Sequence, residues 1–233
     1  MKSCFRLLPE IPDIGDPDLR ALAKLIMNPV TGPAYRKRFQ MVTELCDLPS
    51  ANILELGFGS GFLAYSIAPS SDQYLGVDLH NYPQVVEDNL KSFGIHNIDF
   101  FQGDARNIER IPSGSIDLVV SVSCLEHIKV QDQVQVQEEV IRVLKPGCSA
   151  VYGMPIKNFL THFFFRSLGY NDNEIHPSVP RDTILAARQC GLTLSCEKFY
   201  PFFSGHKTGV YWAGKFKKIA LVSDDTKVVK QFK

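Results

Sequence analysis

Three acidic residues, Glu55, Asp78 and Asp104, stand at the ends of three successive apolar segments. Ionised carboxylates at such positions can accept hydrogen bonds from the hydroxyl, amine or ammonium groups of a ligand. Asp78 follows Glu55 by 23 residues, close to the roughly 20 residues at which a ribose-binding acid follows in a βαβ unit. Taken singly, each acid could also be a helix cap, a loop acid or an Asx turn. Their common placement favours one shared ligand.

A glycine-rich loop, Gly57 to Gly61 in ILELGFGSGFLA, follows the first of these segments. A phosphate-binding P-loop requires the Lys and Ser/Thr of GxxxxGK[ST], which this loop does not contain. A dinucleotide-binding GxGxxG loop requires a third glycine where Phe62 stands. A dinucleotide oxidoreductase is therefore disfavoured, and the remaining pattern is GxGxG preceded by an acid.

Alternating strands and helices from residue 50 onward would bring the three acids together. Strands are predicted at 52–57, 73–80, 97–105, 115–123 and 149–155, and helices at 61–69, 83–94 and 132–147, the last closed by Pro146 and Gly147. This alternation predicts right-handed crossovers and a parallel sheet covered on both faces. Later segments predict a helix at 181–191 and strands at 192–200 and 208–216. The expected fold is an α/β, Rossmann-like doubly wound sheet, mostly parallel with an antiparallel last strand.

The domain organisation is predicted to have three parts. Residues 1–49 form an N-terminal arm and a helical cap, with helices at 16–28 and 33–48. Residues 50–217 form the ligand-binding domain, in which 155–177 are an insertion or lid. Residues 218–233 form a tail without an assigned structure.

Five ordered segments carry a family resemblance: ILELGFGSG, VDLH, GDA, SIDLVVSVSCLEHI and EEVIRVLKPG. They resemble the first, second, third, fourth and sixth motifs of the class I S-adenosylmethionine-dependent methyltransferases, specifically the small-molecule, type 11-like group with LEH and LKPG signatures. The resemblance runs from about Asn52 to Gly147, which is less than half of the chain. It implies a methyltransferase with S-adenosylmethionine as its cofactor.

The chemistry of this cofactor agrees with the acids. S-adenosylmethionine carries a sulfonium and an ammonium but no phosphate, so its site needs carboxylates and closely approaching backbone. Asp78 can accept both ribose hydroxyls, Asp104 the adenine amine, and Glu55 can orient the ammonium. The expected cofactor-binding residues are Glu55, Gly57, Gly59, Gly61, Asp78, Leu79, Asp104, Ala105 and Ser121, with Ile95 and Leu125 as further candidates for the adenine cleft.

Methyl transfer is an in-line displacement in which positioning and desolvation can supply much of the rate. The absence of an obvious catalytic triad is therefore no argument against an enzyme. The position after the fourth strand reads SVSCLEH, which departs from the patterns of amino-methylating nucleic-acid enzymes, cytosine-C5 enzymes and metal-dependent catechol enzymes. A small-molecule or glycan acceptor is favoured, and a non-catalytic cofactor-binding or partner-binding module is the alternative.

A general base is needed only if the acceptor must lose a proton. His127 and His176 are the candidate catalytic residues, and His162 is a weaker one. Each also has a structural interpretation, since LEH is typical of a helix start. The aromatic segment FLTHFFFRSLGY, residues 159–170, predicts a lid or an apolar acceptor pocket, and the basic run 36–38 predicts a solvated face or an anion site.

Composition and residue spacing limit the partners, metals and cellular location that can be expected. Twenty-five basic and twenty-five acidic residues give a net charge of zero, which disfavours nucleic acid as the main partner. The six cysteines are scattered, none with the spacing of a zinc site, and no metal is expected. No signal peptide and no apolar run long enough to span a membrane are evident. A cytoplasmic protein is expected, with its oligomeric state open.

Overall fold

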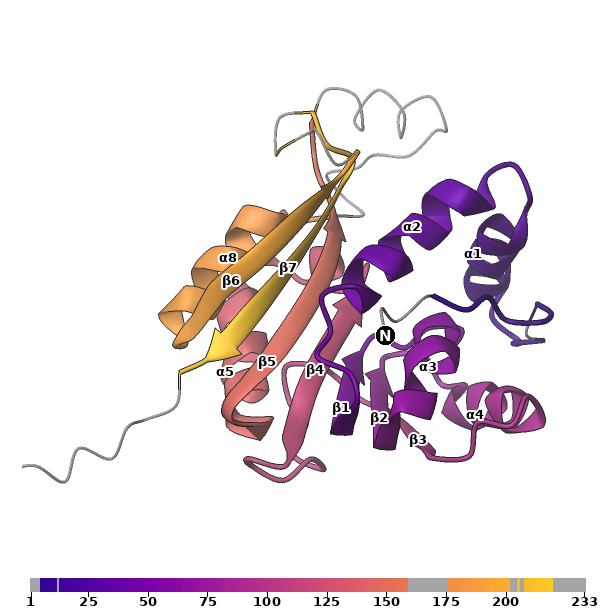
Figure 1. The fold of residues 1–233 in the computed structure, drawn as a ribbon, viewed down its shortest axis with the longest axis horizontal. Helices are drawn as coiled ribbons and strands as arrows, with labels where there is room; N and C mark the ends of the chain where they lie inside the picture. The colour runs from indigo at the N-terminus through magenta and orange to yellow at the C-terminus, as the bar shows by residue number, and fades with distance from the viewer. Residues whose placement is uncertain (1–4, 12, 159–175, 202–204, 206–207, 220–233) are drawn as a thin grey trace, which may run out of the picture.

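A seven-stranded mixed sheet is the framework of the protein (Figure 1). The computed structural model describes residues 5–11, 13–158, 176–201, 205 and 208–219. The strand order is β3-β2-β1-β4-β5-β7-β6. β7 is antiparallel to both of its neighbours, and the other pairings are parallel. The strands are β1 Ser50–Leu56, β2 Ser71–Asp78, β3 Ile98–Gln102, β4 Ile116–Val122, β5 Leu144–Pro155, β6 Leu192–Tyr200 and β7 Tyr211–Lys218.

Helices cover both faces of the sheet (Figure 1). One face packs against α1 Pro17–Met27, α2 Gly32–Thr43, α3 Phe62–Ile67 and α4 Pro83–Ser92. The opposite face packs against α5 Gln133–Val143 and α8 Pro180–Gln189. β4 is buried on both faces, as its continuous apolar run requires. The expected doubly wound fold with an antiparallel last strand is confirmed.

The sheet topology gathers the ends of the central strands at one edge. β1 pairs with β2 on one side and with β4 on the other, all parallel, so their carboxyl ends meet. The strand order reverses between β1 and β4, and open α/β sheets bind ligands at such a switch point. The glycine loop follows β1, Asp78 ends β2 and Ser123 follows β4.

The glycine loop depends on backbone that other residues rarely adopt. Gly57 and Gly61 both have φ +78. A Cβ on Gly57 would lie 2.6 Å from the Sγ of Cys124, so the loop packs directly on the end of β4. The tight contact requires a residue without a side chain, independently of any ligand.

The predicted helix 132–147 is wrong at its C-terminal end. α5 ends at Val143, and Leu144 to Pro155 belong to β5. Pro146 has no N–H to continue a helix, and Gly147 has φ +79. The β4–β5 register shifts at this point, and the Lys218 ammonium binds the carbonyl oxygens of Ile141 and Leu144 at 2.6 Å. The pairing of Leu144 with β4 and the hydrogen bonds from Lys218 therefore occupy backbone groups that would otherwise continue α5.

Two sequence interpretations fall largely outside the described residues. Most of the 155–177 insertion, including the aromatic segment and His162, and the tail from residue 220 are not described, and these interpretations stay predictions. Among the described helices, none combines the length and the apolar character that a membrane-spanning segment requires.

A matched pair of alanine variants tests the packing of the loop. Gly57 and Gly94 both have positive φ, but a Cβ on Gly94 would meet nothing within 4 Å. Gly57→Ala should lower the free energy of unfolding in urea by ~1–3 kcal/mol more than Gly94→Ala, because it adds a clash to the same backbone strain. Equal losses in the two variants would show that the contact with Cys124 is unimportant.

Candidate active site

A cavity of about 680 Å³ opens at the carboxyl ends of β1, β2 and β4. Seven of the expected cofactor residues line it: Glu55, Gly57, Gly59, Asp78, Leu79, Asp104 and Ala105. His127 belongs to the same wall, together with side chains of α1 and α2. Three acids distant in sequence therefore share one cavity with a candidate base.

Hydrogen bonds hold the Asp78 side chain against the backbone of the glycine loop. Its Oδ2 accepts a hydrogen bond of 2.8 Å from the Gly59 N–H, and its Oδ1 accepts a longer one of 3.4 Å from the His80 N–H. The His80 ring returns to the Gly59 carbonyl at 3.1 Å. A carboxylate has about four acceptor sites, so Asp78 retains capacity for two further donors.

Glu55 is buried at the base of the cavity, with a relative exposure of 2%. Burial raises its pKa from 4.5 to about 8; the hydrogen bond from Tyr74 lowers the pKa and the nearby charge of Asp78 raises it. The Tyr74 hydroxyl donates to Oε2 at 2.7 Å. Glu55 is therefore mainly protonated at neutral pH in the chain alone, and a cationic group beside it would favour the ionised form.

Asp104 lies in a turn after β3, where Arg106 binds it with a forked guanidinium. The Arg106 Nη2 lies 2.5 Å from Oδ2, and Nε lies 3.0 Å from Oδ1. These hydrogen bonds hold the pKa of Asp104 below its ordinary value. Arg106 also lines the cavity and pairs with Asp132 at 3.2 Å. The sequence pattern did not indicate Arg106, since a basic residue two positions after an acid is not a distinctive signal.

Four of the candidate cofactor residues do not line the cavity. Ser121 is buried, and its hydroxyl donates to the Leu56 carbonyl at 2.9 Å. Ile95 and Leu125 are core residues on opposite faces of the sheet. Gly61 precedes α3 and packs against α4. These residues belong to the loop and the core and do not face the cavity.

Arg38 extends from α2 into the cavity, which for this residue favours the anion-site interpretation of residues 36–38 over the solvated face. Its guanidinium donates to the Ser123 hydroxyl at 3.1 Å and lies 4.7 Å from the ring centre of Tyr35. Ser123 has φ 54, unusual for a residue other than glycine, and its hydroxyl also contacts the Tyr211 hydroxyl at 3.0 Å. A cation is thus fixed near the end of β4.

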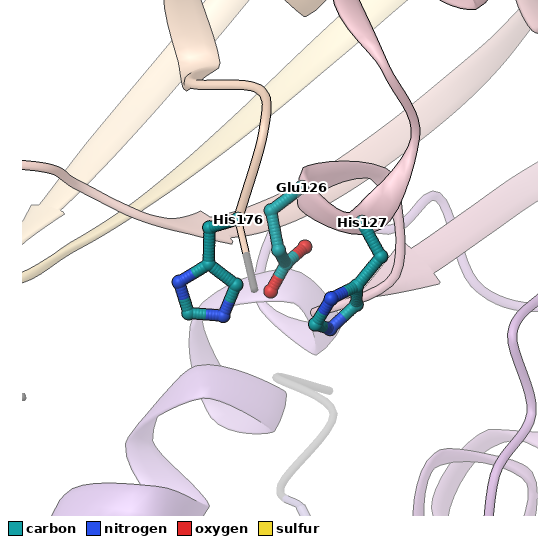
Figure 2. Close-up of side chains that lie close together, drawn as sticks. All are labelled: Glu126, His127 and His176. Carbon is teal, nitrogen blue, oxygen red and sulfur yellow. The ribbon is translucent and has the colours of Figure 1, made fainter. Parts of the chain in front are cut away.

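The two candidate bases lie together, although 49 positions separate them (Figure 2). His127 ends the short 3₁₀ helix η2 Leu125–His127, and His176 precedes α8. The centres of the two rings are 5.1 Å apart. Glu126 lies between them with 1% exposure, and burial raises its pKa to about 7, while the charges of His127 and Arg38 oppose that increase. In the sequence, Glu126 was indicated only as part of a helix start.

The raised pKa of Glu55 predicts a pH dependence of stability. Because the folded chain keeps this proton up to about pH 8 and the unfolded chain releases it near 4.5, stability contributed by Glu55 is lost as pH rises between these values. Wild type should lose up to ~1 kcal/mol per pH unit relative to Glu55→Gln in urea unfolding. A wild-type-to-variant difference that is constant from pH 5 to 8 would contradict the assignment.

Comparisons with known proteins agree with this arrangement. Residues 53–147 match a family model described as a methyltransferase domain. The chain is 24% identical over 157 residues to a ubiquinone biosynthesis O-methyltransferase of Acinetobacter baumannii, covering 63% of this chain and 65% of that protein. It is also 24% identical over 162 residues to a small RNA 2′-O-methyltransferase of Tetrahymena thermophila, covering 62% of this chain and 38% of that protein. The chain thus spans less than two thirds of either relative.

A solved structure shows the same fold. N-methyltransferase NodS of Bradyrhizobium japonicum, in complex with S-adenosyl-L-homocysteine, superimposes with a TM-score of 0.60 at 15% identity, covering 87% of this chain and 99% of that one. One relative is named for an RNA substrate, so the expectation that nucleic acid is not a partner stays a prediction. Residues 53–147 are therefore similar to a methyltransferase domain, and the chain has the fold of the class I S-adenosylmethionine-dependent methyltransferases, a group whose cofactor is S-adenosylmethionine.

Proposed function

We propose that this chain is a methyltransferase that uses S-adenosylmethionine to methylate a small-molecule or glycan acceptor. The observation that supports this most strongly is the placement of Asp78. Its carboxylate, held by the Gly59 N–H at 2.8 Å, faces the same cavity as His127. One end of the cavity thus suits the polar groups of a nucleoside, and the other presents groups that can position an acceptor.

The residues present fit the cofactor. A Cβ on Gly59 would meet only Leu19, at 3.9 Å, so the loop backbone faces open space where a ligand can approach. The carboxylate of Asp78 has acceptor capacity for two ribose hydroxyls. Glu55 lines the cavity beyond the loop and can carry the negative charge that an ammonium group needs. The cavity volume of about 680 Å³ lies within the usual range of ligand sites.

When bound, S-adenosylmethionine supplies an electrophilic methyl group on a sulfonium. The residues of the chain hold the acceptor in line with that group and exclude water, which can supply much of the rate. Leu19, Leu22 and Phe39 provide an apolar wall, and Arg38 provides a fixed cation. This combination favours an acceptor with an apolar body and a polar or anionic substituent.

His127 and His176 are the candidate groups for proton transfer. His127 is exposed in the cavity wall, while His176 is buried behind it. A non-catalytic binding module would be favoured by a cavity that closes over the cofactor. The cavity instead continues to His127 and Arg38, which supports an enzyme.

Asp78→Ala tests the cofactor site. The variant lacks the carboxylate that would accept hydrogen bonds from the two ribose hydroxyls. The dissociation constant for S-adenosylhomocysteine should therefore rise ~10–100-fold in calorimetric titration. Asp72→Ala is the matched control, since Asp72 is an exposed acid at the opposite end of β2. Equal affinity of the Asp78→Ala and Asp72→Ala proteins would refute the ribose assignment.

A substrate panel tests the acceptor class. Release of S-adenosylhomocysteine is measured with phenolic and quinol compounds, with glycans, and with short RNA duplexes. Turnover is expected with an apolar small molecule, and Arg38→Gln should raise KM more for anionic than for neutral acceptors, because it removes the fixed cation. Turnover with RNA alone would contradict the proposed class.

A further inference from the structure

Glu126, His127 and His176 form a compact cluster of metal-binding side chains, here called the EHH cluster (Figure 2). One potential ligand atom from each residue lies within 4.8 Å of the others. Two of the three side chains are buried, with exposures of 1% for Glu126 and 8% for His176. Figure 2 shows the carboxylate of Glu126 between the two imidazole rings.

The backbone around the EHH cluster fixes its two halves against each other. The Ser178 N–H donates to the Glu126 carbonyl at 3.2 Å, and the Ser178 hydroxyl donates to the Ile128 carbonyl. His176, two residues before Ser178, is thereby held beside η2. The segment before α8 and the segment after β4 meet at this point independently of any ligand.

Among the described residues, one carboxylate oxygen of the EHH cluster has no hydrogen-bond donor. The Oε2 of Glu126 is fully buried and accepts no hydrogen bond from any residue in the described part of the chain. A buried carboxylate oxygen without a partner is costly. Arg38 is close enough to affect Glu126, but its guanidinium donates to the Ser123 hydroxyl and the Tyr35 carbonyl. A cation between the carboxylate and the imidazoles would satisfy this oxygen.

We propose that the EHH cluster binds a divalent transition-metal cation of the zinc class. Two imidazole nitrogens and one carboxylate oxygen are the protein ligands of many catalytic zinc sites, which leave a position open. Imidazole ligands favour zinc and its neighbours over magnesium and calcium, which prefer oxygen. Because His127 lines the cavity, a cation held by the EHH cluster would lie beside the acceptor.

The consequence for the reaction rests on the proposed function. A cation at this place selects an acceptor whose reacting atom is oxygen, since a hydroxyl can occupy the open position and its pKa falls there. The hydroxyl proton is released to solvent. An oxygen lone pair then forms the new bond to the methyl carbon, and the electron pair of the breaking S–C bond stays on sulfur. As ligands of the cation, His127 and His176 would serve in place of the proton-transfer role considered for them above.

The binding is tested with Co²⁺ as the probe on the full chain after removal of metal by a chelator. Visible absorption should show saturable binding of one Co²⁺, displaced by Zn²⁺ and not by millimolar Mg²⁺. His127→Ala, His176→Ala and Glu126→Gln should each weaken binding at least ~10-fold, since even loss of an outer-shell partner costs that much. His96→Ala is the matched control, because His96 is exposed on the loop before β3.

Two further measurements distinguish loss of the metal site from loss of folding or of cofactor binding. Thermal unfolding checks that each variant folds, and His127→Ala removes an exposed side chain, so it gives a folded test even if a buried variant fails. Affinity of the wild-type protein for S-adenosylhomocysteine, measured separately, distinguishes failure of the metal site from failure of the proposed cofactor site. Absence of saturable Co²⁺ binding, or equal binding by the His127→Ala and His96→Ala proteins, would overturn the proposal.

Discussion

The hydrogen bond from the Gly59 N–H to the Asp78 carboxylate joins the ends of β1 and β2, and the site depends on it. It can form only because the glycine loop turns with positive φ and packs against Cys124 at the end of β4. One short turn thus fixes three strand ends relative to one another. The cavity, the orientation of Asp78 and the exposure of the loop backbone follow from that geometry.

The two ends of the cavity have different electrostatic character. Glu55 and Asp78 place carboxylates where a cationic, phosphate-free ligand would lie, and Glu55 keeps its proton until such a charge arrives. Arg38 and His127 line the other end, and the rest of the EHH cluster is buried behind it. In the proposed function, cofactor recognition and acceptor positioning would therefore rest on different elements of the fold, so that one could vary without the other.

The strand-end acids were predictable because parallel strands end at one edge of a sheet, so three acids that each follow an apolar run must converge. Other features were not. His176 lies beside η2 although 49 positions separate it from His127, and periodicity does not reveal this contact. The fork of Arg106 on Asp104 and the entry of Arg38 into the cavity depend on side-chain directions. The start of β5 at Leu144 depends on a register shift that no local signal marks.

A crystal structure of the chain with S-adenosylhomocysteine is the most direct test of the central claim that the cavity is a methyltransferase site. The ribose hydroxyls are predicted to bind the Asp78 carboxylate, with the sulfur directed toward His127 and Arg38. A ligand bound elsewhere, or a sulfur directed away from His127 toward solvent, would contradict the assignment of both ends of the cavity.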